Sequence, residues 1–398
     1  MIKLADKKYC MGCKACGDTC YINAISFPED ENGFWYPVIN EVACVKCGRC
    51  VQACPVLKKT QADIQKMLPK VYSAYSKEYK VRQKSTSGGI FYELAAQIIR
   101  QGGVVCGCRY SDDYYHAYHS FAENMEELEH LVGSKYFQSD TDGMYRKISS
   151  FLKDGRKVLF CGTPCQSAAV QRYLSTVQYD NLLLADFVCL GINSPKGYRA
   201  FISELEDKYC SKIKKVRFKD KTRGWLNLGT KVFFENGTVY YGNRYTDPWV
   251  NSYIVGKFFI RQSCSVCCFK GIPRVSDITL GDFWGLDFTQ DEGKNGVSLV
   301  MINSEKGERY FRQIQEHLAC TERSVSAAVK GNQQINHQVS LDKEKQNIFF
   351  KKLEKEKFSH VVWRMLGSTV SKRYCHWFMI LLKTRLVKIQ KQLHIFVK

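Results

Sequence analysis

The chain has 398 residues, a formal net charge of +20 and 19 cysteines, and 45% of its residues are hydrophobic. This length allows a small N-terminal module beside one large domain or two medium ones, with enough apolar side chains for a sizeable core. The N-terminal stretch MIKLADKKYC lacks an apolar signal-peptide core, and no apolar run approaches the ~20 residues of a membrane-spanning helix. We therefore expect a cytoplasmic protein with reduced cysteines, and no recognisable nucleic-acid-binding module explains the positive charge.

Eight cysteines lie in two nearly identical runs, CMGCKACGDTC at 10–20 and CVKCGRCVQACP at 44–55. This spacing is typical of bacterial two-cluster ferredoxins, in which the fourth cysteine of each run binds the other cluster. A zinc or disulfide module is the alternative, but neither needs a duplicated run of four cysteines. The rule assigns one [4Fe-4S] cluster to Cys10, Cys13, Cys16 and Cys54, and a second to Cys44, Cys47, Cys50 and Cys20.

The pattern changes after this module from cysteine-rich loops to alternating strands and helices. Strands are predicted at 71–75, 104–110, 157–161, 181–189 and 297–302, and helices at 88–103, 125–132, 144–153, from 164, and at 195–209. Strands dominate 213–260, where 231–242 form a hairpin with Asn236-Gly237 at its turn. The fold class is therefore an α+β ferredoxin-like module at 1–56, a linker at 57–70, an α/β domain at 71–345 and a basic amphipathic segment at 346–398.

Two glycines follow hydroxyl side chains at a predicted helix start, in STSGGIF at 85–91. Backbone N–H groups at such a turn can bind an anion such as a phosphate. Ordinary capping of the helix by Ser or Thr explains the same residues equally well.

A second helix start lies in FCGTPCQ at 160–166. Thr163 and Gln166 have the spacing of a capping box, and Pro164 suits the first helical position. Cys165 would then lie in the first turn, where the helix dipole favours a thiolate. A buried structural cysteine is the alternative.

Further cysteines occur singly and as a pair. Cys189 ends a predicted buried strand in DFVCLG, and Cys264 and Cys267 form a C-x2-C pair with Cys268 adjacent. One pair and two single cysteines supply four thiolates, enough for a third cubane cluster, although zinc could use the same ligands.

A resemblance to a known family covers almost the whole chain. It rests on the motifs STSGGIFYELAAQIIRQGGVVCGCRY, GSKYFQSD, KVLFCGTPCQSAAV, NLLLADFVCLGINSPKGYRAF, FKDKTRGW and RQSCSVCCFKG with SDITLGDFWG. The chain resembles the beta-subunit family of coenzyme F420 hydrogenases and dehydrogenases, in the form that has an N-terminal two-cluster ferredoxin domain. Relatives of this kind include proteins from surface-polysaccharide gene clusters. The resemblance implies an α/β flavin-binding domain that holds FAD beside its own [4Fe-4S] cluster.

The resemblance also implies site residues. The third cluster's ligands would be Cys165, Cys189, Cys264 and Cys267, with Cys161 and Cys268 as competitors. The flavin phosphates would lie at Ser87, Gly88 and Gly89, and the cofactor cleft would be lined by Ser134, Lys135, Tyr136, Gln138, Gly162 and Thr163. Asp282 would lie near the cleft or act as a structural turn residue; no catalytic residue is assigned.

The function expected from these features is that of an iron–sulfur flavoprotein oxidoreductase. It would move electrons between its clusters and FAD, with a redox partner protein or a soluble carrier at one end, and reduce a small molecule such as a sugar precursor or a deazaflavin-type coenzyme. The alternative is an electron-transfer subunit that feeds a separate catalytic partner and has no substrate of its own.

The last residues of the chain are strongly basic, because 358–398 contain eight Lys or Arg and no Asp or Glu. Their longest apolar run, WFMILL, is too short to span a bilayer but suits a helix lying at the inner face of the membrane. A final helix packed on the protein's own core and a partner-docking helix are the alternatives.

Overall fold

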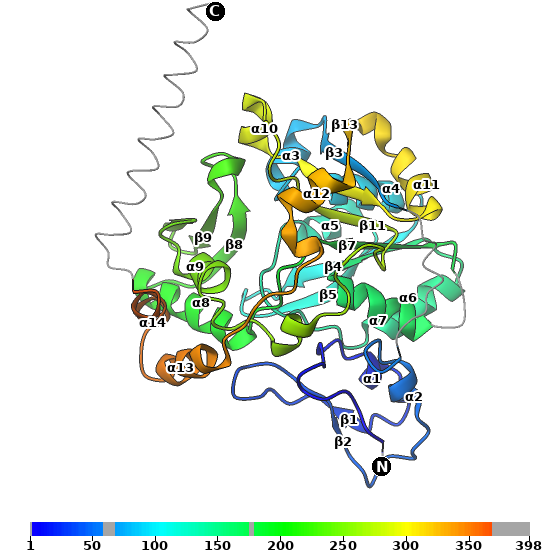
Figure 1. Cartoon of the computed structure of the whole chain (residues 1–398), viewed down its shortest axis with the longest axis vertical. Coiled ribbons are helices and arrows are strands. Elements are labelled where there is room, and N and C mark those ends of the chain that lie inside the picture. The colour runs from blue at the N-terminus through cyan, green and yellow to red at the C-terminus, as the bar shows by residue number, and fades with distance from the viewer. Residues whose placement is uncertain (1, 59–67, 175–178, 368–398) are drawn as a thin grey trace, which may run out of the picture.

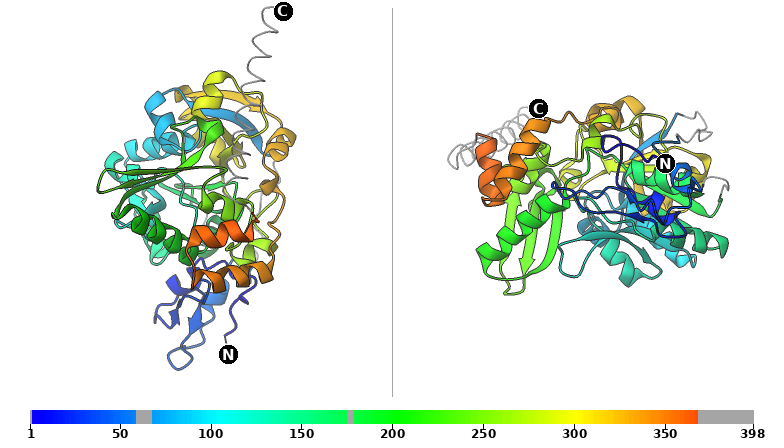
Figure 2. Two further views of the ribbon diagram at one scale, coloured as in Figure 1. Left: turned by 90° about the vertical axis from the view of Figure 1, so that its left-hand side faces the viewer. Right: turned by 90° about the horizontal axis from the view of Figure 1, so that it is seen from below.

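The computed structural model describes residues 2–58, 68–174 and 179–367. Residues 368–398, on which the expectation of membrane contact rests, lie outside them, as does most of the expected linker. No helix of the three described stretches has the length and apolar character needed to cross a bilayer. The N-terminal module lies at one end, below a large sheet and a smaller one that stand side by side (Figure 1), and the side views agree (Figure 2).

The N-terminal module has little regular structure. It consists of α1 (Ala15–Asp18), β1 (Ile25–Ser26), β2 (Val38–Ile39) and α2 (Arg49–Gln52), with β1 and β2 antiparallel. Each short helix follows a loop that turns through left-handed φ at the second and fourth positions after its first cysteine. These positions are Gly12 and Lys14 in the first loop, and Lys46 and Gly48 in the second. The two halves therefore repeat in backbone conformation as they do in sequence.

The large sheet has eight strands in the order β13-β3-β12-β11-β7-β6-β4-β5. Its strands are β3 (Lys70–Ser76), β4 (Val104–Tyr110), β5 (Ala117–Ala122), β6 (Val158–Gly162), β7 (Leu182–Phe187), β11 (Ile278–Asp282), β12 (Ser298–Ile302) and β13 (Leu318–Arg323). The central strands β4, β6, β7 and β11 are parallel, and the outer pairings are antiparallel. This arrangement brings the carboxyl ends of four parallel strands to one edge.

Helices cover both faces of the large sheet, which explains its continuous apolar strands. On one face Leu159 and Leu183 pack with α4 (Ile90–Arg100), α5 (Met125–Leu131) and α11 (Glu305–Arg312). On the other face Phe160 and Leu184 pack with α6 (Met144–Lys153) and α7 (Pro164–Leu174). The shorter helices around it are α3 (Tyr79–Lys84), α10 (Gln290–Asn295), α12 (Val325–Gly331), η3 (Gln315–His317) and η4 (Gln333–Ile335).

The smaller sheet has the order β10-β9-β8 and an aromatic core. Its elements are β8 (Ile213–Asp220), η1 (Trp225–Asn227), β9 (Gly229–Phe234), β10 (Val239–Asn243), α8 (Pro195–Tyr209), α9 (Pro248–Ile254), η2 (Gln262–Val266), α13 (Lys343–Leu353) and α14 (Phe358–Met365). The hairpin predicted at Asn236-Gly237 is confirmed, with Gly237 at φ 83°. The described start of the basic segment packs on this core through Phe358 and Val361 in α14.

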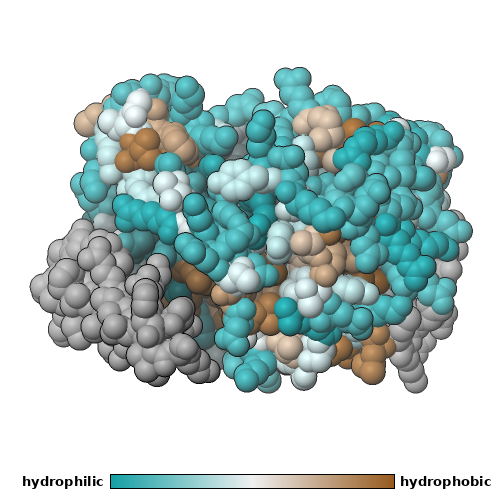
Figure 3. Space-filling view, turned by 90° about the horizontal axis from the view of Figure 1, so that it is seen from above, coloured by the Kyte–Doolittle hydropathy of each residue, from teal (hydrophilic) through white to brown (hydrophobic). Residues whose placement is uncertain are grey.

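Seen from above, most of the face is hydrophilic (Figure 3). Hydrophobic residues lie in its middle and lower part and in smaller groups near its upper edge.

Candidate functional site

Four of the N-terminal cysteines surround one small cavity. Cys10, Cys13, Cys16 and Cys54 all line it. Burial raises the pKa of Cys13 to about 12, and the nearby thiolates of Cys10 and Cys54 contribute to this rise. Four thiols around one cavity fit a group of positively charged iron atoms.

The second predicted set lies at α2. Burial raises the pKa of Cys50, and the charges of Cys47 and Cys44 add to the effect, so these three thiols lie together. Cys20 follows α1, which packs against α2, and its Sγ accepts a hydrogen bond from the Ala24 N–H at 3.3 Å. Cys47 is exposed, so this set is the outermost of the thiol groups.

The third predicted set is brought together from three elements. Cys165 lies in the first turn of α7, Cys189 follows β7, and Cys264 and Cys267 lie in and after η2. Burial raises the pKa of Cys189 to about 12 and that of Cys264 to about 11, with further raising contributions from neighbouring thiolates of the set. The cations of Lys270 and Arg274 act in the opposite direction on Cys189.

The competing cysteines are placed differently. Cys161 is half-buried near the end of β6 and lines a separate cavity. Desolvation, followed by the charges of Asp186 and Cys108, raises its pKa to about 12. Cys268 lines the same cavity as Cys165, Cys264 and Cys267 but is exposed. Within the described residues no three His, Cys, Asp or Glu side chains form a group that could hold a metal ion. A cubane cluster does not need such a group, because each of its four thiolates binds a different iron atom.

The capping box predicted at α7 is confirmed. The Gln166 N–H donates to Thr163 Oγ1 at 3.4 Å, and the Thr163 N–H donates to Gln166 Oε1 at 2.9 Å. Thr163 Oγ1 also lies 3.1 Å from Cys165 Sγ. The box fixes the helix start and thereby the position of the Cys165 thiol.

A cavity of about 270 Å³, called here the central cavity, lies at the carboxyl ends of β4, β6, β7 and β11. Ligands of α/β sheets bind at such edges. Of the residues expected at the flavin, seven line it: Ser87, Gly89, Ser134, Lys135, Tyr136, Thr163 and Asp282.

Three other residues expected at the flavin do not line this cavity. The Gly88 N–H donates to Ser298 Oγ at 2.8 Å, and a Cβ at Gly88 would collide with the Ala74 carbonyl oxygen. A Cβ at Gly162 would lie 2.7 Å from the Phe160 ring. Gln138 instead contacts the N-terminal module, since its Nε2 donates to the Met11 and Gly12 carbonyls at 3.3 Å.

The sequence allowed two interpretations of the start of α4, an anion-binding turn or ordinary capping by Ser or Thr, and the structure contradicts the second. Its N-cap is Gly89, at φ 95°, and no side chain caps the helix, so capping by Ser or Thr is wrong. Ser87 Oγ instead donates to the Val297 carbonyl at 2.9 Å. Gly89 and Ile90 line the central cavity, so the uncapped first turn borders it.

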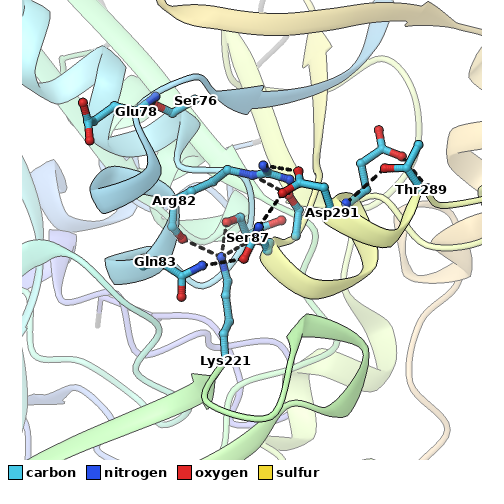
Figure 4. A network of polar contacts seen from close by, with 11 residues as sticks. Ser76, Glu78, Arg82, Gln83, Ser87, Lys221, Thr289 and Asp291 are labelled. Atoms are coloured by element: carbon cyan, nitrogen blue, oxygen red, sulfur yellow. Dashed lines mark hydrogen bonds and ion pairs between the residues drawn. The ribbon is translucent and has the colours of Figure 1, made fainter.

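A buried lysine fixes the loop before α4. Lys221 Nζ donates to the carbonyls of Arg82, Ser87 and Asn295 at 2.6, 2.5 and 2.7 Å (Figure 4). Burial lowers its pKa to about 7. Lys221 therefore joins the 85–88 loop to the segment that leads into β12.

Asp282 lies at the end of β11 with two partners. Its carboxylate forms an ion pair with Lys219 and accepts a hydrogen bond from Trp225 Nε1 at 3.3 Å. Burial alone would lower the pKa of Lys219, but the Asp282 carboxylate raises it above its usual value. Sequence reasoning missed Lys219 as a cavity residue, although it lies in the quoted motif FKDKTRGW.

The N-terminal module is fixed to the rest of the chain by buried polar contacts. The fully buried Arg261 donates from Nε to the Cys10 carbonyl at 2.9 Å, and from its Nη atoms to Gln138 Oε1 and the Trp35 carbonyl at 3.0 Å. Asp18 of α1 caps α6, because its oxygens accept from the Gly143 and Tyr145 N–H groups at 2.7 and 2.9 Å.

The three inner sites share walls. Met11 and Val56 line both the cavity of Cys10 and Cys54 and that of Cys165 and Cys264. Ile192 lines the latter cavity and the central cavity, which Cys189 also lines. A continuous series of sites therefore leads from the N-terminal module to the edge of the large sheet.

Comparison with known families matches most of these regions. Two models of the coenzyme F420 hydrogenase/dehydrogenase beta subunit, one for its N-terminal part and one for its C-terminal part, match residues 71–144 and 155–327. Two models of a 4Fe-4S dicluster domain match residues 9–57 and 36–89.

Individual relatives agree with the family models. An uncharacterized protein of Methanocaldococcus jannaschii, MJ1349, is 26% identical over 344 residues, which are 77% of this chain and 87% of the relative. The ferredoxin-type protein NapF of Haemophilus influenzae is 43% identical over 53 residues, 13% of this chain and 30% of NapF.

A chain of the F420-reducing [NiFe] hydrogenase complex from Methanosarcina barkeri is 17% identical, with a TM-score of 0.49 over 71% of this chain and 92% of that one. The matches of both halves of one family and of the dicluster domain show that the chain belongs to the coenzyme F420 hydrogenase/dehydrogenase beta-subunit family and is an iron–sulfur electron-transfer protein.

Proposed function

We propose that the chain moves electrons between three [4Fe-4S] clusters and an FAD, and reduces a small molecule at the flavin. The ligands would be Cys10, Cys13, Cys16 and Cys54 for the first cluster, Cys44, Cys47, Cys50 and Cys20 for the second, and Cys165, Cys189, Cys264 and Cys267 for the third. Family membership supports the redox class, and the placement of the thiols supports this division.

The residues of the third site fit an iron–sulfur cluster. Four thiols are buried or half-buried there. Lys270 and Arg274 carry positive charge close to Cys189. Nearby cations stabilise thiolates, which are the form that binds iron.

The central cavity fits a flavin. It lies at the carboxyl edge of parallel strands, and its wall combines the turn at Ser87 and Gly89 with apolar residues such as Leu131 and Leu190. A bound flavin would accept two electrons together and release them singly, which cluster chemistry requires. The wall shared with Cys189 would hold such a ring beside the third cluster.

One observation carries the proposal: the first thiol set, the third thiol set and the central cavity follow one another, and each shares wall residues with the next. Met11 and Val56 separate the first and third thiol sets, and Ile192 separates the third set from the central cavity. Electron transfer needs cofactors that follow one another closely, and one residue layer between sites meets that need. The exposed Cys47, with the exposed Val42 and Val45 beside it, would be the point at which a redox partner docks.

A substrate would reach the flavin through a larger groove of about 970 Å³. This groove meets the central cavity at Tyr136, Leu190, Lys219, Tyr253 and Asp282. Trp225, Trp284 and Ile254 make much of its wall apolar. We therefore propose a small molecule with a substantial apolar part. The second candidate is an electron-transfer subunit without its own substrate, and the exposed Cys47 of the second thiol set favours it.

Rapid mixing with a reduced bacterial ferredoxin tests the proposal. We expect the ferredoxin to reduce the flavin quickly in wild-type protein and only slowly in Cys264→Ser, while dithionite still reduces the flavin of both. The matched control is Cys320→Ser, on the outer strand β13. Equal rates for wild type and Cys264→Ser would show that electrons do not pass through the third site.

A further inference from the structure

A second cavity, called here the basic cleft, opens beside the central cavity. Its volume is about 450 Å³, and it lies between β8, the end of β4 and the 132–135 loop. Seven of its lining residues are cationic: Lys84, Arg109, Lys135, Lys214, Lys215, Arg217 and Lys219. Only two, Asp112 and Glu129, are acidic.

The alternation of strand β8 produces part of this charge. Val216 and Phe218 are buried in the aromatic core of the smaller sheet. Successive side chains of a strand point to opposite faces, so Lys215 and Arg217 lie on the face away from that core. There they line the cleft.

Among the described residues, three of the seven cations of the cleft have no carboxylate partner. The other four are paired: Lys84 and Arg109 with the two acids of the cleft, Lys219 with Asp282, and Arg217 with Asp220. Within the described residues, no carboxylate lies within ion-pair distance of Lys135, Lys214 or Lys215. Lys135 Nζ lies 3.1 Å from each of four carbonyl oxygens in the segment 130–133, at the end of α5, and shares its three N–H donors among them. Like charges held together repel, and a bound polyanion would relieve that repulsion.

The basic cleft is continuous with the central cavity. Ser85, Thr86, Ser134, Lys135 and Lys219 line both. One ligand can therefore extend from the apolar end beside Cys189 to the cationic end beside Lys215. Lys and Arg are the residues that hold phosphate groups in such sites.

We infer that the basic cleft binds the phosphate-bearing part of a ligand whose other end lies in the central cavity. Two sources share this chemistry: the diphosphate of the flavin cofactor itself, and the phosphates of a second, phosphorylated substrate. The assignment of the other end rests on the function proposed above, whereas the anion site does not.

Charge reversal in full-length protein tests the inference. The variant is Lys215→Glu, at an exposed position that can change without loss of the fold, and the matched control is Lys208→Glu on the neighbouring α8, outside the cleft. Two quantities are measured: the affinity for inorganic pyrophosphate by calorimetry, and the FAD retained after dialysis.

If the cleft serves a substrate, pyrophosphate binds the FAD-loaded wild type, and Lys215→Glu weakens this binding about tenfold without loss of FAD. If it serves the cofactor, pyrophosphate does not bind the loaded protein, and Lys215→Glu loses FAD where Lys208→Glu keeps it. The inference is overturned if Lys215→Glu and Lys208→Glu both match wild type in both measurements. A chain that purifies without flavin contradicts the proposed function, but pyrophosphate binding then still tests the cleft.

Discussion

Cys161 and Cys165 are separated by four positions along the chain, yet their surroundings differ. Burial raises the pKa of both thiols, but the charged neighbours that add to this rise differ. They are Cys267, Cys189 and Cys264 for Cys165, and Asp186 and Cys108 for Cys161. Sequence spacing identified both as candidates but could not separate them. Which thiol faces which cavity depends on how the turn between β6 and α7 is closed, and the Thr163–Gln166 capping box closes it.

Serine substitutions at single cysteines test this difference. Because Cys189 belongs to the third thiol set, Cys189→Ser should lower the iron content by about four atoms per chain. Cys161→Ser and Cys268→Ser should keep the full content. Iron analysis of anaerobically purified protein measures this, and a loss of four iron atoms in Cys268→Ser with none in Cys189→Ser would reverse the assignment.

Elements with a strong period or a clear end signal could be predicted from the sequence. The helix at Met144–Lys153 and the Asn236-Gly237 hairpin are confirmed. Strands β5, β11 and β13 were missed, because their polar residues give no clear alternation. They are strands because neighbours in the large sheet supply their hydrogen bonds, and this information is not local.

The start of α9 gives a pH-dependent prediction at the scale of an element. Asp247 caps this helix, with its Oδ1 accepting from the Val250 N–H at 3.0 Å. Burial raises its pKa to about 7, and the hydrogen bond from the Val250 backbone amide only partly opposes this. A carboxyl with a raised folded-state pKa stabilises the fold at low pH, and this contribution is lost as the pH rises through that value.

Asp247→Asn keeps the capping oxygen and removes the charge. Its free energy of unfolding, relative to wild type, should therefore rise by about 1 kcal/mol between about pH 6 and about pH 8. Chemical denaturation at several pH values measures the difference. A difference that stays constant, or falls, as the pH rises would mean that Asp247 is charged throughout.

The arrangement of the whole molecule depends on contacts that the sequence does not reveal. Gln138 was expected in the flavin cleft but binds the first cysteine loop, and Asp18 caps a helix more than a hundred residues later. Such pairs have no periodic signal. The cluster motifs, by contrast, could be read from spacing because metal ligation constrains neighbouring residues.

Arg261 provides a test of how the N-terminal module is held. Replacing it by Leu leaves the carbonyls of Cys10 and Trp35 without their buried donor, at a cost on the order of 3 kcal/mol. We expect faster hydrogen exchange in residues 10–36. Arg199→Leu, which removes a partly exposed ion pair to Glu29 between the same parts, should change little. Equal exchange in the two variants would mean that Arg261 does not hold the module.

The most direct test of the whole account is the cofactor content of the anaerobically purified full-length chain. Three cubane clusters and one flavin predict about twelve iron atoms, as many acid-labile sulfides, and about one FAD per chain. About eight iron atoms with zinc in place of the rest, or the absence of flavin, would contradict the proposed path from the N-terminal clusters through the third cluster to the central cavity.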